Sequence, residues 1–103
     1  PFYGDFYLYL SKIIRYFPKS EKFIISSQIK SKMLDFIGAL IKANKQRDKR
    51  ESMLESDVLL EQLKTLIRLS KDLEYMKEAQ YENCCKALSE IGKILGGWIK
   101  SCG

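Results

Sequence analysis

The chain has 103 residues, of which 46% are hydrophobic and 30% are charged, and its formal net charge is +5. A chain of this length forms one domain with its own core, so we expect a single domain over residues 1–103. Histidine is absent, which removes the commonest general base, and no pair among the three cysteines has the spacing of metal ligands. Composition therefore argues against a zinc site and against histidine-based catalysis.

Positive charge is concentrated in the first half of the chain. Residues 1–50 contain eleven Lys and Arg against four Asp and Glu, whereas residues 51–103 contain seven against nine, which gives +7 and −2. Part of the acidity forms one block: Glu51, Glu55, Asp57 and Glu61. A basic surplus indicates a polyanionic or acidic partner.

Neither a signal peptide nor an apolar run near about 18 residues is present, so we expect neither secretion nor a membrane span. The odd cysteine count is typical of a reduced, cytoplasmic protein. Because the chain begins at Pro1 rather than at Met, we expect native residues to precede it.

The first expected helix has an apolar stripe at spacings of four, three and four residues. Its members are Phe6, Leu10, Ile13 and Phe17. Pro18 ends this helix, and residues 18–25 are expected to form a connection with one helical turn.

The second expected helix begins with Ser26 as its N-cap and ends in the polar run 44–49. Its main apolar stripe is Ile29, Met33, Phe36, Leu40 and Ala43. A second stripe beside it is Leu34, Ile37 and Ile41. This helix is therefore apolar over a wide arc.

The third expected helix covers residues 50–75, and its seam also spans a wide arc. The seam is Leu59, Leu63, Leu66 and Leu73, with Ser70 between the last two and with Leu60 and Ile67 widening it.

The fourth expected helix covers residues 78–101 and has an apolar repeat of three and four residues. Its members are Tyr81, Cys84, Leu88, Ile91, Leu95, Trp98 and Cys102. This period favours shallow left-handed packing.

Four such helices with short connections predict an all-α, up-down-up-down four-helix bundle. A bundle alone needs one buried face per helix. The extra apolar arcs on the second and third helices therefore indicate a homo-oligomer.

The fourth helix contains three interior glycines, each of which costs about 1 kcal/mol relative to Ala. Gly92 and Gly96 are four residues apart, so they share a face that can accept a neighbouring helix or an RNA backbone. Trp98 is expected to anchor the end of the seam. The alternative is that Gly96 and Gly97 only mark a kinked or frayed helix end.

No residue pattern supports catalysis, so we predict a protein without enzymatic activity or cofactor. Cys84 and Cys85 lie on or beside the seam, where a buried thiol is the favoured interpretation over a nucleophile. Glu51 and Glu55 lie four residues apart on what looks like a solvated helix face.

Basic side chains recur in rows that suit phosphate contacts. One row is Lys64, Arg68 and Lys71; another is Lys86, Lys93 and Lys100; a third runs from Lys12 and Arg15 towards Lys19 and Lys22. The alternative is a solvated face with ion pairs, such as Lys86 with Glu82 or Glu90, and Lys64 with Glu61. For the first row, the only same-face acids we identify are Glu61 and Asp57 upstream, so we expect it to stay largely unneutralised.

Several segments together resemble the accessory variability determinant of diversity-generating retroelements. They are Phe17-Pro18-Lys19-Ser20, Leu59-Leu60-Glu61-Gln62-Leu63-Lys64, Leu66-Ile67-Arg68-Leu69-Ser70-Lys71-Asp72-Leu73, Tyr81-Glu82 and Glu90-Ile91-Gly92-Lys93-Ile94-Leu95-Gly96-Gly97-Trp98. The last segment is the most specific. Four-helix proteins encoded in ribosomal RNA intervening sequences are similar in fold and more distant in sequence.

The resemblance implies a homopentameric barrel of four-helix bundles with a basic surface and no catalytic activity. It also implies binding to the element's reverse transcriptase and its template RNA, or to DNA or an RNA/DNA hybrid, in support of error-prone complementary DNA synthesis. Lys64, Arg68 and Lys93 match basic positions of the family, whereas Lys71, Lys86 and Lys100 are candidates from spacing alone. An oligomeric scaffold that binds no nucleic acid remains the alternative.

Overall fold

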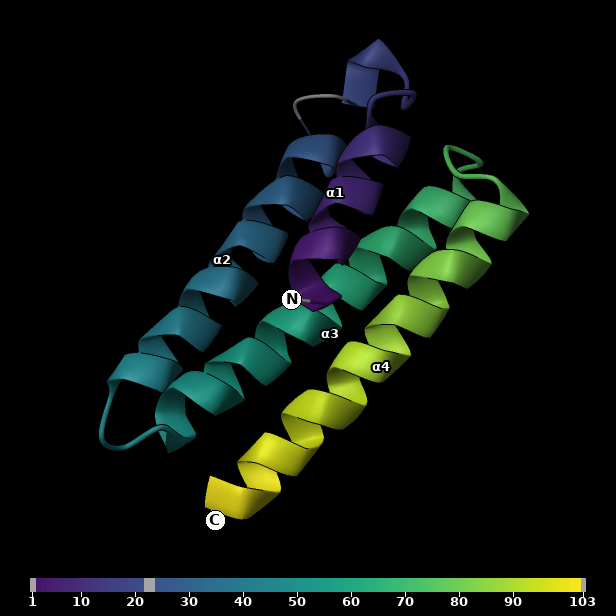
Figure 1. Ribbon diagram of the computed structural model, residues 1–103. Helices are drawn as coiled ribbons and strands as arrows, with labels where there is room; N and C mark the ends of the chain where they lie inside the picture. Colours follow the sequence, from purple (N-terminus) through teal and green to yellow (C-terminus); the bar gives the residue numbers. More distant parts are fainter. Residues whose placement is uncertain (1, 22–23, 103) are drawn as a thin grey trace.

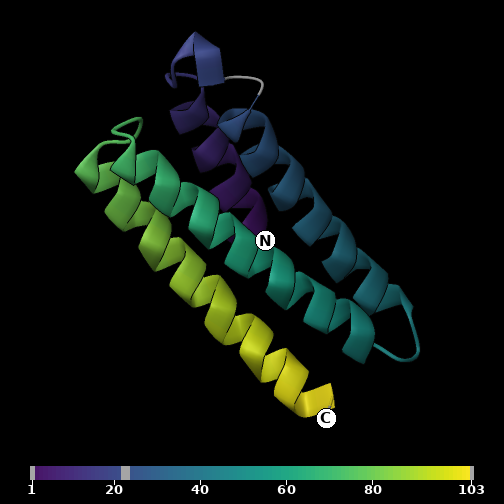
Figure 2. The same cartoon turned by 180° about the vertical axis from the view of Figure 1, so that it is seen from behind.

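The computed structural model describes residues 2–21 and 24–102. The elements in chain order are α1 (Phe2–Ile14), a 3-10 turn η1 (Lys19–Glu21), α2 (Ile25–Lys45), α3 (Arg50–Asp72) and α4 (Glu78–Cys102) (Figure 1). Consecutive helices run in opposite directions, and the reverse view shows the same order (Figure 2). The bundle is rod-shaped, with extents of 43 × 23 × 20 Å. The prediction of an all-α, four-helix fold is confirmed.

The core is formed by the stripes that the sequence predicts for the first two helices. All nine members are buried: Phe6, Leu10, Ile13, Phe17, Ile29, Met33, Phe36, Leu40 and Ala43. In the second stripe of α2, Leu34 and Ile41 are exposed and Ile37 is half-buried. The wide apolar arc of α2 therefore leaves uncovered apolar surface on the single chain.

The buried face of α3 differs from the predicted seam. Leu63 is buried, but the face is completed by Leu60 and Ile67, and Leu59 and Leu66 are only half-buried. Because α3 packs against both α2 and α4, the two residues expected only to widen the seam lie at the centre of its buried face. Leu73 is 48% exposed, since it lies after the last residue of the helix.

Polar groups within the α3 core are satisfied locally. Ser56 donates a hydrogen bond to the carbonyl oxygen of Ser52 at 2.8 Å, and Ser70 donates one to that of Leu66 at 2.8 Å. Ser52 donates to Oε1 of Gln46 at 2.8 Å. Buried hydroxyls bonded in this way add little cost to the core.

The ends of α1 and α2 lie near the predicted positions, but the predicted cap of α2 is wrong. α1 ends at Ile14, and the chain turns through Phe17, whose N–H donates to the carbonyl of Ile14 at 3.0 Å. The N-cap of α2 is Ile24, with no side-chain hydrogen bond, and Ser26 lies inside the helix. Its hydroxyl is buried and has no hydrogen-bond partner.

The turn between α3 and α4 closes the end of α3 with paired backbone hydrogen bonds. The N–H of Tyr75 donates to the carbonyl of Ser70, and the N–H of Glu74 donates to that of Lys71, each at 2.9 Å. This pairing is the Schellman motif, which places one residue in the left-handed region. That residue is Glu74, with φ of 64°. The turn places the ring of Tyr75 against that of Phe17, with 5.7 Å between the ring centres.

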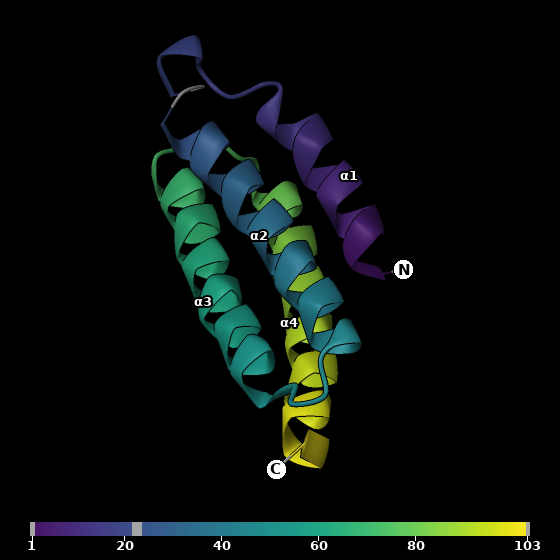
Figure 3. The same cartoon turned by 90° about the vertical axis from the view of Figure 1, so that its left-hand side faces the viewer.

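α1 is much shorter than the other helices and covers only part of the bundle. It has 13 residues, against 21 in α2 and 25 in α4. The side view shows α1 beside one half of α2 and α4, with their other halves extending past its N-terminus (Figure 3). Apolar residues of α2 and α4 in that uncovered half have no fourth helix against them.

Candidate nucleic-acid interface

The basic row of α3 lies along a groove between α3 and α4. The groove has a volume of about 310 Å³ and is lined by Lys64, Ile67, Tyr81, Cys85, Leu88 and Ser89. Nζ of Lys71 lies 5.0 Å from the centre of the Tyr81 ring, in cation–π geometry. The predicted row therefore follows the contact between the last two helices.

Each cation in this row has a carboxylate nearby. Nζ of Lys64 lies 3.2 Å from Oε1 of Glu61. Nε of Arg68 lies 3.3 Å from Oδ1 of Asp72, and Nζ of Lys71 lies 4.0 Å from Oε2 of Glu78. The expectation of a largely unneutralised row is wrong, because Asp72 follows Arg68 by one turn and Glu78 comes from α4.

These ion pairs lie at the surface and are weak, because each includes a carboxylate that is more than half exposed. In the Arg68 pair the side chains are 62% and 53% exposed. Pairs of this kind contribute about 0–1 kcal/mol and are screened by salt. Hydrogen bonding to Asp72 raises the pKa of Arg68, and Tyr81 adds to the effect, so the guanidinium stays charged. A phosphate or a carboxylate of a partner can replace Asp72 at small cost.

The basic row of α4 is free of such pairs. Lys86, Lys93 and Lys100 are exposed, and within the described part of the chain none of them forms an ion pair. The alternative pairs of Lys86 with Glu82 or Glu90 are absent there. α4 therefore presents three available cations, seven residues apart, along its outer surface.

Two glycines lie between the last two of these lysines. Gly96 and Gly97 are three or four residues from both Lys93 and Lys100, so they occupy the surface between them. Both glycines are exposed, and a Cβ added at either would meet nothing within 4 Å. We call Lys86, Lys93, Lys100, Gly96 and Gly97 the α4 strip.

Contacts within the single chain do not explain why glycine occupies positions 92, 96 and 97 of α4. A Cβ at Gly92 would lie 3.7 Å from Cδ2 of Leu60, which is ordinary van der Waals distance. No described glycine has a positive φ, so backbone conformation does not require them either. α4 is helical through Gly96 and Gly97 up to Cys102, so they do not end the helix.

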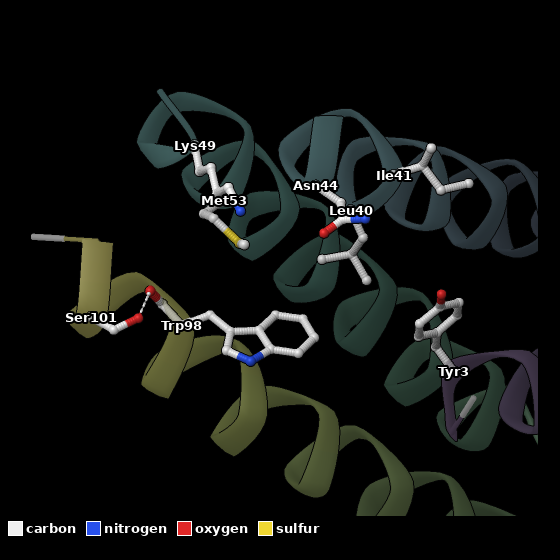
Figure 4. Close-up of a pocket in the computed structure, with 8 residues that line it drawn as sticks. All are labelled: Tyr3, Leu40, Ile41, Asn44, Lys49, Met53, Trp98 and Ser101. Carbon is white, nitrogen blue, oxygen red and sulfur yellow. Dashed lines mark hydrogen bonds between the residues drawn. The ribbon is translucent and has the colours of Figure 1, made fainter. Parts of the chain in front are cut away.

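An apolar hollow opens where α1 stops short of the other helices. One part, of about 240 Å³, is lined by Tyr3, Phe36, Leu40, Ile91, Ile94, Leu95 and Trp98. An adjoining part, of about 490 Å³, extends to Asn44, Lys49, Met53 and Ser101 (Figure 4). Trp98 projects into this space and is 43% exposed, so it does not anchor a closed seam.

The comparison with protein families decides the assignment. A bAvd-like family model matches residues 3–102. The chain belongs to the bAvd-like family. No match to it was found among curated proteins. Membership suggests an accessory protein of a diversity-generating retroelement, which is a non-catalytic type of protein.

Two further features of this bAvd-like chain bear on chemistry. Within residues 2–21 and 24–102, no group of His, Cys, Asp and Glu side chains has the arrangement of a metal site. No described helix is long and apolar enough to cross a membrane.

The two adjacent cysteines of the bAvd-like chain have different environments. The Cys84 side chain is fully buried, and this burial raises the pKa of its thiol to about 12, with a smaller contribution from Cys85. Cys84 is therefore a core residue, as the seam predicts. Cys85 is exposed beside Tyr81, whose pKa it raises. The expectation of a buried thiol is therefore wrong for Cys85, which lies one residue off the buried face of α4.

The structure also reveals a basic corner that the rows did not predict as a unit. At the end of α1 and the start of α2, Arg15, Lys19 and Lys30 line one hollow. The predicted row joined Arg15 and Lys19 across Pro18 with Lys12 and Lys22, and it did not include Lys30. Lys22 lies outside the described residues. The signal was available, because a short connection brings the end of one antiparallel helix close to the start of the next.

Proposed function

We propose that this bAvd-like chain is a non-catalytic accessory protein of a diversity-generating retroelement. It binds the reverse transcriptase and the template RNA and supports mutagenic complementary DNA synthesis. The observation that carries the proposal is the α4 strip, which combines unpaired cations with a bare stretch of backbone. The matching family gives the biological setting.

The α4 strip suits an RNA backbone. Three exposed lysines neutralise phosphates and release counterions, which gives salt-dependent affinity with little sequence preference. The bare surface at Gly96 and Gly97 lets a strand approach the helix between Lys93 and Lys100 without meeting side chains. An oligomer repeats this strip, so one RNA can contact several subunits.

The α3 row suits the protein partner. Lys64 lines a groove that also has an apolar floor of Ile67 and Leu88. Arg68 and Lys71 continue the row along α3, one and two turns beyond Lys64. Their weak pairs with carboxylates on this chain can exchange for carboxylates of the polymerase at similar energy. Groups that are paired in both states gain specificity more than affinity.

Assembly is proposed to use the apolar hollow beside Trp98. Ile94 is 42% exposed and Ile41 is 54% exposed in the single chain, and both border this hollow. Burial of such a surface against a second copy removes apolar area from water, at roughly 25 cal/mol per Å². The resemblance implies five subunits in a barrel.

Retention of reverse transcriptase tests the central function. The variant Lys64→Glu with Arg68→Glu should fold as the wild type does and lose retention of the polymerase on the immobilised protein. The matched control is Lys42→Glu with Lys45→Glu, which makes the same charge change at the end of α2 and should retain it. Retention by both variants would contradict the role of the α3 row.

A scaffold without nucleic-acid binding is the second candidate. The observation that favours it is that all three cations of the α3 row are paired within the chain. It predicts negligible RNA affinity at about 150 mM salt together with an intact oligomer in light scattering. Measurable RNA binding under these conditions, lost when the α4 strip is altered, excludes it.

A further inference from the structure

The corner between α1 and α2 contains a hollow whose lining is basic and polar. Its volume is about 550 Å³. It is lined by Ser11, Ile14 and Arg15 of α1 and its following turn, by Phe17 and Lys19 of the connection, and by Ser26, Ser27 and Lys30 of α2. The corner lies at the top of Figure 1, where α1 ends and α2 begins.

Three cations border this hollow, and none of them is paired with a carboxylate of the described residues. Arg15, Lys19 and Lys30 are exposed, and none forms an ion pair with another described residue. Among the described side chains, no carboxylate lines the hollow. The contrast with the α3 row is direct, because every cation there has a carboxylate within 4.0 Å.

One hydroxyl in the hollow is buried without a partner. Ser26 is 3% exposed, it lines the hollow, and its Oγ makes no hydrogen bond. An unsatisfied buried polar group of this kind costs about 1–3 kcal/mol, so natural proteins rarely retain one without a partner. A ligand that accepts a hydrogen bond from Oγ would remove that cost.

The start of α2 adds a favourable field for an anion. Ser26 and Ser27 are the second and third residues of a 21-residue helix, whose N-cap Ile24 contributes no side-chain hydrogen bond. The N-terminus of a helix carries positive partial charge and unsatisfied N–H groups, which suit phosphate. The three cations and the unpartnered hydroxyl converge at this end.

We propose that this corner is a phosphate-binding site, separate from the α3 row and the α4 strip. The phosphate accepts a hydrogen bond from Oγ of Ser26 and is neutralised by Arg15, Lys19 and Lys30. Two sources supply this chemistry: a free phosphate, or a phosphodiester of a nucleic-acid strand. Only the second source rests on the proposed function.

Thermal unfolding in inorganic phosphate tests the free source. Compared with chloride at equal ionic strength, phosphate should raise the melting temperature of the wild-type protein through binding to the folded state. Ser26→Ala should bind phosphate roughly tenfold more weakly, because it loses one hydrogen bond to an anion. Its melting temperature in chloride should not fall, since the hydroxyl has no partner to lose. Lys30→Gln should also reduce the rise, whereas the matched control Lys45→Gln at the far end of α2 should keep it.

A single-stranded RNA with a 5′-hydroxyl tests the strand source. If the corner holds a strand phosphate, Ser26→Ala should weaken RNA binding and inorganic phosphate should compete for the wild type but not for this variant. Phosphate stabilisation without any RNA binding supports the site and contradicts the proposed function. RNA binding that is insensitive to Ser26 and Lys30, together with no phosphate stabilisation, overturns the site and leaves the proposed function standing.

Discussion

Nε of Arg68 donates a hydrogen bond to Oδ1 of Asp72 over 3.3 Å, one turn further along α3. The pair holds the guanidinium against its own helix, beside the groove between α3 and α4. Both side chains remain more than half exposed, so the contact is available for exchange with a partner. The affinity of the α3 row for an acidic partner therefore depends on how easily the ion pair between Asp72 and Arg68 breaks.

Removal of Asp72 should strengthen binding of an acidic protein partner by this row. We expect Asp72→Asn to raise the affinity for the reverse transcriptase by about threefold at low salt, because Arg68 loses its competitor. Asp57→Asn makes the same charge change on exposed α3 surface away from Arg68 and should have a smaller effect. Fluorescence anisotropy of the labelled protein, titrated with reverse transcriptase, measures both. Equal gains in the two variants would show that only net charge matters.

Replacement of the glycines of the α4 strip by Ala should stabilise the fold but weaken assembly or RNA binding. Gly96→Ala with Gly97→Ala should raise the free energy of unfolding by about 1 kcal/mol per site, because Ala is the better helix former and nothing blocks a Cβ. The same variant should weaken assembly or RNA retention, since something outside the chain must approach there.

Gly38→Ala is the matched control for this experiment. Gly38 also lies inside a helix with nothing within 4 Å of an added Cβ. It should stabilise the fold and leave RNA retention unchanged. Calorimetry and light scattering give the two readouts. A stabilised Gly96→Ala variant that still assembles and binds RNA like the wild type would remove close approach as the explanation.

The left-handed residue after α3 predicts a stabilising substitution. Glu74 has φ of 64°, a conformation that glycine adopts without steric cost. Glu74→Gly should stabilise the fold by about 1 kcal/mol, which corresponds to a melting temperature about 4 °C higher. Glu82→Gly, the same chemical change inside α4, should destabilise by a similar amount. A destabilised Glu74→Gly protein would mean that this turn differs in solution.

The adjacent cysteines should differ in reactivity towards alkylating reagents. Cys85 is exposed and should be modified rapidly near pH 8, whereas Cys84 is buried with its pKa raised to about 12 and should react only after unfolding. Mass mapping of each labelled cysteine distinguishes them. Equal labelling rates for Cys84 and Cys85 in the folded protein would contradict the core position of Cys84.

The raised pKa of Cys84 also gives a pH dependence of stability. The pKa of Cys84 in the folded protein lies above the ordinary value of 9.0, so the unfolded protein loses the thiol proton at lower pH than the folded protein does. The stabilising contribution of the protonated thiol to folding is therefore complete below about pH 9 and is lost as the pH rises towards 12. Cys84→Ala should lessen this alkaline loss, although it also leaves a smaller side chain in the core. The comparison is therefore made on the pH slope of unfolding and not on its absolute free energy.

Periodicity predicted the buried faces of α1 and α2 because those faces meet the core directly. It failed for Trp98, since the exposure of this residue depends on where α1 stops relative to α4. The cap predicted at Ser26 from its residue type is wrong, because a cap depends on the path of the preceding loop. The pair of Arg68 with Asp72 could be predicted from the sequence, because residues four apart on a helix are neighbours on its surface. Glu78 near Lys71 required knowledge of how α3 turns into α4.

The basic surfaces, too, could be predicted from the sequence only in part. The rows on α3 and α4 follow from spacing within one helix, so the sequence predicted their members. Which of them are free depends on acids supplied by other turns and helices. The corner at Ser26 joins side chains from two helices and a connection, and spacing within one element does not find such a set.

The salt dependence of RNA affinity tests the central claim most directly. Each phosphate contact on a single strand contributes about 0.7 to the slope of log affinity against log salt. Replacement of Lys86, Lys93 and Lys100 by Gln should therefore reduce the magnitude of the slope by about 2, whereas the same change at Lys32, Lys42 and Lys45 of α2 should alter it little. An unchanged slope in the α4 variant, or equal losses in both variants, would contradict RNA binding by the α4 strip.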